Sequence, residues 1–248
     1  MNPGSLLYRY AAPVRFHALA GPMARVLWLI AVPLGVAGLV LGFFVAPTDA
    51  QQGEVYRILY LHVPAAWLSM LLYAAMAGWS AIGLAFNARL AFTLAQAIAP
   101  TGAVMTFLAL WTGALWGQPT WGTWWVWDAR LTSELILLLL YLGIIALRGA
   151  IDDPHRAAHA TAVCALIGVV NVPIIYFSVV WWNTLHQGAT VNLTRASTIA
   201  PAMAWALLLC TLALWCHVAA VVLLRARRLV VEEESARGAR WALQWRAA

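Results

Sequence analysis

The sequence predicts an all-α integral membrane protein, a bundle of six transmembrane helices that forms one domain over residues 1–248. Three observations predict this fold class. The chain of 248 residues is 64% hydrophobic and only 10% charged, and its mean hydropathy is +0.80. Apolar stretches long enough to cross a bilayer recur along the whole chain, with no polar block between them. The arginines gather beside these stretches, as they do in multi-pass membrane proteins.

Windows of about 20 apolar residues predict spans at 24–45, 64–86, 92–115, 133–148, 160–182 and 200–224. The first follows Arg9, Arg15 and Arg25 and is too long for a signal-peptide core, so we expect an uncleaved span. The fourth has only about 16 residues before Arg148. We therefore expect it either to start inside the preceding tryptophan-rich segment or to cross a locally thin bilayer.

The arginines also predict an orientation. Twelve of the 15 basic residues, all arginine, fall on one predicted side of the membrane, and Arg57, Arg130 and Arg195 fall on the other. Because arginine-rich loops stay in the cytoplasm, both termini and the basic tail 225–248 should be cytoplasmic. The tail could lie along the membrane surface, contact a partner or stay solvated. In a bacterial inner membrane the outward loops 46–63, 116–132 and 183–199 then face the periplasm.

Charge and cysteine content exclude several classes of protein. The net charge of +6 follows from the loop asymmetry, and no basic stripe carries interleaved aromatics, so we expect membrane lipid rather than nucleic acid as a partner. Cys164, Cys210 and Cys216 lie in apolar stretches and form neither CxxC nor CxxCH. The chain is therefore neither a thiol-exchange protein nor itself a c-type cytochrome.

Two histidines lie at the outward ends of predicted spans. His62 precedes Pro64, and because proline favours the first turn of a helix, the ring should lie at the outer mouth of the second span. His186 follows the fifth span after a short polar segment. One such histidine is more often an interfacial residue than a ligand, but two at one depth can supply both axial ligands of a haem iron. We expect structural or surface roles for the other four: His17, His155, His159 and His217.

Tryptophans are concentrated in the segment WGTWWVWDAR, residues 121–130. An aromatic belt explains the scattered Trp28, Trp67, Trp116 and Trp215, but it does not explain so dense a cluster. If the segment is helical, Trp121, Trp125 and Asp128 share one face, and Trp127 and Arg130 share another. Indoles pack flat against a porphyrin over a large area. The predicted binding surface includes the four indoles of the cluster: Trp121, Trp124, Trp125 and Trp127.

Charged residues flank this surface. Arg130 can take a haem propionate in a bidentate pair, with Asp128 orienting the guanidinium or the indole donors. The alternatives are an ion pair of Arg130 with Glu134, at i+4 spacing, and a helix N-cap at Asp128. Arg57, in the same outward layer as His62, is a second candidate for a propionate, and its alternative is an ordinary interfacial arginine.

These segments resemble the CcmC family, haem-handling membrane proteins of bacterial cytochrome c maturation. The resemblance covers nearly the whole chain in three blocks: QQGEVYRILYLHVPAAWLSM, WGTWWVWDARLTSELILLLLYLG with the "WWD" motif, and GVVNVPIIYFSVVWWNTLHQGAT. It implies that His62 and His186 bind the iron of haem b, carried as cargo, and that Trp121, Asp128 and Arg130, together with Trp125, belong to the binding surface. It further implies four partners: the haem chaperone CcmE, the ATP-binding cassette pair CcmA and CcmB, and the small single-span protein CcmD.

We therefore expect a haem-binding and haem-delivery protein rather than an enzyme, because the outward loops contain no nucleophile activated by a base. One alternative is a haem-translocating channel or transporter subunit, which needs a polar or small-residue path through the spans. Another is a membrane cytochrome b, which keeps its haem between histidines buried within the spans. Histidines at the ends of spans favour a cargo that leaves.

Overall fold

The computed structural model describes residues 12–186 and 199–246, and the regular structure there is helical apart from one isolated bridge between Asp49 and Gly53. Six helical segments in this part are long and apolar enough to cross a membrane: Pro13–Val45, Glu54–Phe86, Arg89–Trp121, Ala129–Ala150, Pro154–Trp181 and Pro201–Ala236. They correspond in order to the six predicted spans. The predicted all-α fold with six spans is confirmed, and its orientation in the membrane stays a prediction.

The first three spans are joined by short turns. Helix α2 (Pro13–Val40) runs into one π-helical turn, η1 (Leu41–Val45), and a 3-10 turn, η2 (Glu54–Ile58), leads into α3 (Leu59–Phe86). Asn87 ends α3 in the left-handed conformation with φ 49°, which asparagine tolerates better than most residues. Helix α4 (Arg89–Trp121) then returns along α3.

The tryptophan-rich segment is not helical. Helix α4 ends because Gly122 takes the left-handed conformation (φ 77°), and α5 (Ala129–Ala150) begins after Asp128, whose side chain caps it. Residues 122–128 between them form no helix, so the condition under which Trp121, Trp125 and Asp128 would share a helical face is not met. The fourth span therefore starts inside the tryptophan-rich segment 121–130, as one of the two predicted alternatives had it, and its 22 residues are long enough to cross a bilayer of ordinary thickness.

The fifth span is broken. Helices α6 (Pro154–Gly168) and α7 (Asn171–Trp181) are separated by residues 169–170, whereas the sequence predicted one continuous stretch. Tyr73 of α3 lies against the break, where a side chain on Gly168 would collide with its hydroxyl. The missing side chain at Gly168 thus allows the close approach of α3.

The last span is longer than predicted. Helix α8 (Pro201–Ala236) continues beyond residue 224, and after a turn at Gly238 (φ 78°) helix α9 (Arg240–Arg246) folds back. The rings of Trp241 and Trp245 lie 5.5 and 4.8 Å from that of buried His17 on α2. The described part of the tail is therefore helical, and α9 packs on the chain itself.

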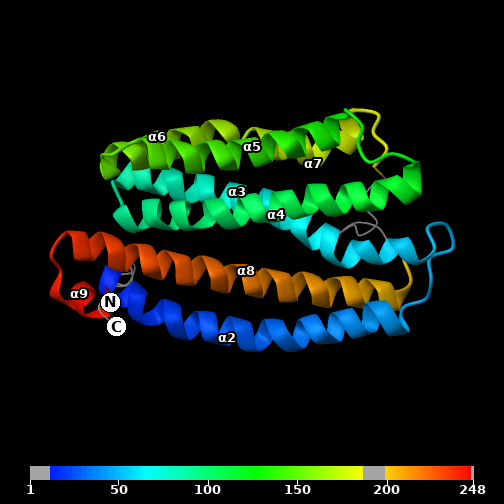
Figure 1. The fold of residues 1–248 in the computed structure, drawn as a ribbon, viewed down its shortest axis with the longest axis horizontal. Helices are drawn as coiled ribbons and strands as arrows, with labels where there is room; N and C mark the ends of the chain where they lie inside the picture. The colour runs from blue at the N-terminus through cyan, green and yellow to red at the C-terminus, as the bar shows by residue number, and fades with distance from the viewer. Residues whose placement is uncertain (1–11, 187–198, 247–248) are drawn as a thin grey trace, which may run out of the picture.

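Figure 1 shows α2 and α8 lying side by side along their lengths, beside a second group formed by α3, α4, α5 and the α6–α7 pair. The start of α2 and α9 lie at one end of the bundle. The connections 46–53, 122–128 and 182–186 all lie at the opposite end. Segments far apart in the sequence, including those that carry His62 and His186, are thereby gathered at one end.

Candidate functional site

His62 lies in the first turn of α3 and packs against α4. Its Nδ1 is 3.0 Å from Oγ1 of Thr112, and its ring meets Trp116 edge-on, with the ring centroids 5.6 Å apart. The indole Nε1 of Trp116 donates to Oε1 of Gln52 at 2.8 Å. Trp116 is therefore a partly buried neighbour of His62, and its place in an aromatic belt stays a prediction.

His186 lies beyond the end of α7, in a segment without regular structure. Its ring centroid is 5.3 Å from that of Trp121, the last residue of α4. Burial and, to a lesser extent, the charge of Arg130 lower the pKa of His186 to about 4, against the opposing effect of Asp128. At neutral pH the imidazole is therefore uncharged and keeps a lone pair that a metal can accept.

Electrostatic interactions connect four predicted site residues. Arg130 and Asp128 act electrostatically on His186, and Arg130 and His186 act on His62. The four groups come from the start of α3, the start of α5 and the segment after α7. The fold thus brings both predicted iron ligands and the predicted propionate-binding arginine into one region.

The indoles of the motif do not form one flat surface. Trp121 faces His186, whereas Trp125 and Trp127 meet nearly at right angles, with an interplanar angle of 78° at 5.3 Å. Only one of these last two rings can lie flat on a given porphyrin plane. Trp124 and Trp127 are 59% and 76% exposed, so they are accessible at the surface. The Nε1 of Trp125 is buried and has no hydrogen-bond partner in the described part of the chain.

The contacts of Asp128 and Arg130 bear on two alternatives to haem binding, the helix N-cap at Asp128 and the ion pair of Arg130 with Glu134. Asp128 Oδ1 accepts from the backbone N–H of Leu131 at 2.8 Å, which confirms the N-cap. Its Oδ2 is buried without a partner among residues 12–186 and 199–246. Arg130 donates from Nη1 to the Ile175 carbonyl at 2.7 Å. It makes no direct ion pair with Glu134, although the two charges act on each other.

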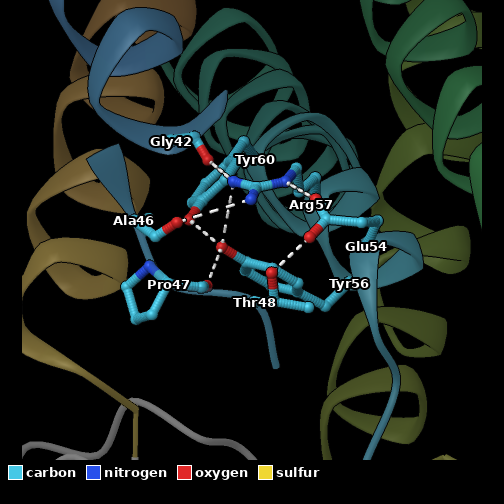
Figure 2. A network of polar contacts seen from close by, with 8 residues as sticks. All are labelled: Gly42, Ala46, Pro47, Thr48, Glu54, Tyr56, Arg57 and Tyr60. Carbon is cyan, nitrogen blue, oxygen red and sulfur yellow. Dashed lines mark hydrogen bonds and ion pairs between the residues drawn. The ribbon is translucent and has the colours of Figure 1, made fainter. Parts of the chain in front are cut away.

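Arg57 joins two segments of the chain, as Figure 2 shows. Its Nε pairs with Glu54, and its Nη1 donates to the carbonyl of Gly42 at the end of the first span. Its Nη2 lies 3.4 Å from the carbonyl of Ala46, and the guanidinium stacks over the ring of Tyr56. A propionate would share these donors with the protein, and the role predicted for Arg57 in haem binding stays a prediction.

A family model described as heme exporter protein C matches residues 6–241, which include every predicted site residue. The chain belongs to the heme exporter protein C family. It is 48% identical to the Escherichia coli K12 heme exporter protein C over 231 residues, 93% of each chain. It is 53% identical to the Bradyrhizobium diazoefficiens protein of that name over 193 residues, covering 76% of this chain and 72% of the relative.

In this member of the heme exporter protein C family, a buried polar cluster lies next to the site and escaped the sequence analysis. Ser69 on α3 donates to Oε1 of Glu134 at 2.6 Å, and the Tyr141 hydroxyl donates to the Ser69 carbonyl at 2.9 Å. Glu134 is only 5% exposed, and its Oε2 has no partner in the residues that the structure describes. The signal was present, because an acidic residue in a span is a functional candidate by default.

Proposed function

We propose that this chain binds haem b as cargo at the end of the bundle that carries the 122–128 connection, and delivers it to the haem chaperone CcmE. Its family is named for haem export, and six apolar helices make it a multi-pass membrane protein. One observation carries the proposal. His62 and His186 are distant in sequence, yet the charge of Arg130 acts on both imidazoles, and Trp121 packs beside His186. We assign these two imidazoles as the axial ligands of the iron.

The unpaired polar atoms of the site fit the chemistry of haem. Haem offers a flat apolar ring, an iron and two carboxylates. We assign the guanidinium of Arg130 and the buried Nε1 of Trp125 as donors to a propionate, because the charge of Arg130 acts on both imidazoles and the indole nitrogen lacks a partner in the described chain. Arg57 is the second propionate contact that we propose. Trp121 and the exposed Trp124 and Trp127 supply aromatic surface for the porphyrin.

In this proposal the protein holds haem and hands it over without covalent catalysis of its own. His186 lies on a segment without regular structure, and Trp124 and Trp127 stay exposed, which suits a cargo that an acceptor must reach. We further propose that the site faces the periplasm from the bacterial inner membrane, and that CcmA, CcmB and CcmD are partners in the same system.

The test is ligand removal in the assembled complex. We expect His62→Ala and His186→Ala, each purified with the partner proteins, to lose haem and to shift the Soret band. His155→Ala is the matched control, since His155 lies exposed at the start of α6 with its ring against His159. Haem content and Soret spectra that match the unmodified protein in both test variants would refute ligation by this pair.

A further inference from the structure

The imidazole of His62 packs against one face of α4. Thr112 meets Nδ1, Gly113 lies beside the ring, and Trp116 meets it edge-on. We propose that Thr112 is a positioning residue that fixes His62 in the tautomer with the proton on Nδ1 and so leaves Nε2 as the iron ligand. This inference rests on the proposed ligation of haem by His62.

The argument begins with the single proton of the Thr112 hydroxyl. Its Oγ1 lies 2.6 Å from the carbonyl oxygen of Leu108, 3.3 Å from that of Ala109 and 3.0 Å from His62 Nδ1. Two oxygens 2.6 Å apart repel unless a proton lies between them, so the hydroxyl donates to Leu108. The Thr112 oxygen then faces His62 with a lone pair.

It follows that His62 is the donor in its contact with Thr112. A neutral imidazole carries its proton on one nitrogen, and a lone pair facing Nδ1 requires the proton to be there. The proton is therefore held on Nδ1, facing Thr112 of α4, and Nε2 keeps the lone pair that iron needs.

The rotation of the ring is restricted as well. A Cβ placed on Gly113 would lie 3.1 Å from Cε1 of His62, so the glycine lets the ring lie close to the α4 backbone. Trp116 covers the ring from the side and is held in turn by Gln52, whose own backbone N–H donates to Asp49 at 2.8 Å. Thr112 thus determines which nitrogen of His62 carries the proton, and Gly113 and Trp116 determine how the ring is oriented.

His186 has no equivalent support. Its Nδ1 is buried without a hydrogen-bond partner among the described residues, and the chain around it is not helical. The two predicted ligands thus differ, since His62 is preorganised by a helix and His186 is not. A ligand whose second nitrogen donates a hydrogen bond is more basic and better oriented, and losing that bond typically weakens metal binding about 10- to 100-fold.

The tautomer can be measured directly in the unmodified protein. The full chain is labelled with ring-¹⁵N histidine, and the His62 signals are assigned by their loss in His62→Ala. We expect a haem-free sample at neutral pH to show a protonated Nδ1 and a bare Nε2. A protonated Nε2 with a bare Nδ1 would overturn the inference, and this measurement needs no variant of Thr112.

Variants test the consequence for haem. In the complex, we expect Thr112→Val to weaken haem binding about 10-fold or more and to move the midpoint potential of bound haem to more positive values, because a less basic ligand favours ferric iron less. Thr112→Ser keeps the hydroxyl and should restore both. Thr106→Val is the matched control, since Thr106 is equally buried in α4 and donates to the Gly102 carbonyl without touching an imidazole.

The outcomes separate this inference from the proposed function. If Thr112→Val equals the unmodified protein in affinity and potential while His62→Ala loses haem, Thr112 has no positioning role and the ligation stands. If His62→Ala keeps its haem and spectrum, both the ligation by His62 and the positioning role of Thr112 are refuted. Weaker haem binding and a more positive potential in Thr112→Val, with both values restored in Thr112→Ser, support the positioning role.

Discussion

The two carboxylate oxygens of Asp128 have different surroundings. Oδ1 caps α5 through the Leu131 N–H, while Oδ2 is buried without a partner in the described chain. Asparagine keeps a capping oxygen but loses the negative charge, and alanine loses both. We expect Asp128→Ala to lower the free energy of unfolding by about 1 kcal/mol and Asp128→Asn by clearly less.

Unfolding in detergent, followed by tryptophan fluorescence, measures the stability of these Asp128 variants, and haem content is measured alongside. Both variants should hold less haem if the charge orients the site. Equal stability losses in the two variants would contradict the capping role assigned to Oδ1.

The two histidines are expected to contribute unequally. His62 is held by Thr112 and Trp116, whereas His186 Nδ1 lacks a partner in the part of the chain that is described. Preorganisation reduces the ordering that binding must impose, so we expect His62→Ala to speed haem loss more than His186→Ala does. Transfer of haem from the purified complex to apomyoglobin gives both rates. A faster loss from His186→Ala would reverse this ranking.

At this scale the sequence indicates which residues matter better than it indicates what they touch. His62, His186 and Arg130 were predicted from their places at the ends of spans, and the fold brings them into electrostatic range. Thr112 looks like any small polar residue in an apolar helix, and its role depends on which helix packs beside it. The packing of α3 against α4 is a feature of the tertiary structure, and no local sequence pattern predicts it.

Among the elements, the tryptophan-rich segment shows where periodicity misleads. The i, i+4 spacing of Trp121 and Trp125 fits a helix, but Gly122 ends α4 and Asp128 starts α5, so the connection between them is extended. Both boundary signals were present in the sequence. The spans themselves were predictable because hydrophobic length alone determines them.

The approach of α4 to α5 depends on one glycine. A Cβ on Gly102 would run into the ring and hydroxyl of Tyr141, whose hydroxyl bonds the Ser69 carbonyl. We expect Gly102→Ala to destabilise the bundle by about 1–3 kcal/mol, because overpacking forces side chains out of their preferred conformations. Gly143→Ala is the matched control, since a Cβ there meets nothing within 4 Å.

Denaturant unfolding of the purified chain compares the Gly102 and Gly143 variants. Gly143→Ala should be neutral or slightly stabilising, because alanine favours helix over glycine by about 0.5–1 kcal/mol. If the two variants lose stability equally, close contact between α4 and α5 is not what Gly102 provides.

Arg57 holds the end of the first span against the start of the second. Its donors reach the carbonyls of Gly42 and Ala46 and the carboxylate of Glu54, a geometry that lysine cannot reproduce. We expect Arg57→Lys to lower the free energy of unfolding, because lysine cannot keep all of these hydrogen bonds at once. Arg89→Lys should cost much less, since Arg89 is exposed and pairs with Glu234 at 3.4 Å.

Unfolding in detergent gives both costs, and limited digestion with proteinase K reports on the 46–53 connection. We expect faster cleavage there in Arg57→Lys than in Arg89→Lys. If Arg57→Lys instead keeps full stability and loses haem, Arg57 serves the propionate rather than this contact between spans.

Across the whole molecule, the least predictable features are those in which distant segments meet. At the break between α6 and α7, Tyr73 of α3 lies against Gly168. The tail was expected to follow the membrane, to meet a partner or to be solvated, yet α9 packs on His17 of α2. In both places the decisive contact comes from a helix remote in sequence, so composition and hydropathy are uninformative there.

The bundle has two chemically different ends, and their orientation can be tested. The start of α2 and α9 lie at one end, and the connections 46–53, 122–128 and 182–186 lie at the other (Figure 1). Twelve of the 15 arginines were predicted on the side of the termini, a bias that predicts a cytoplasmic location for that end. We therefore expect a cysteine at exposed Gln51 to react with a membrane-impermeant maleimide in intact spheroplasts, and one at exposed Asp152 to react only after lysis.

The unmodified chain is the background control for this labelling, because its three cysteines lie within the spans. Labelling of Gln51→Cys in intact spheroplasts, with Asp152→Cys protected, would place the site on the periplasmic side, where a haem acceptor outside the membrane can reach Trp124 and Trp127. The reverse pattern would turn the site toward the cytoplasm. Delivery to a periplasmic chaperone would then be impossible without a separate step that carries haem across the bilayer, however well His62 and His186 bind the iron.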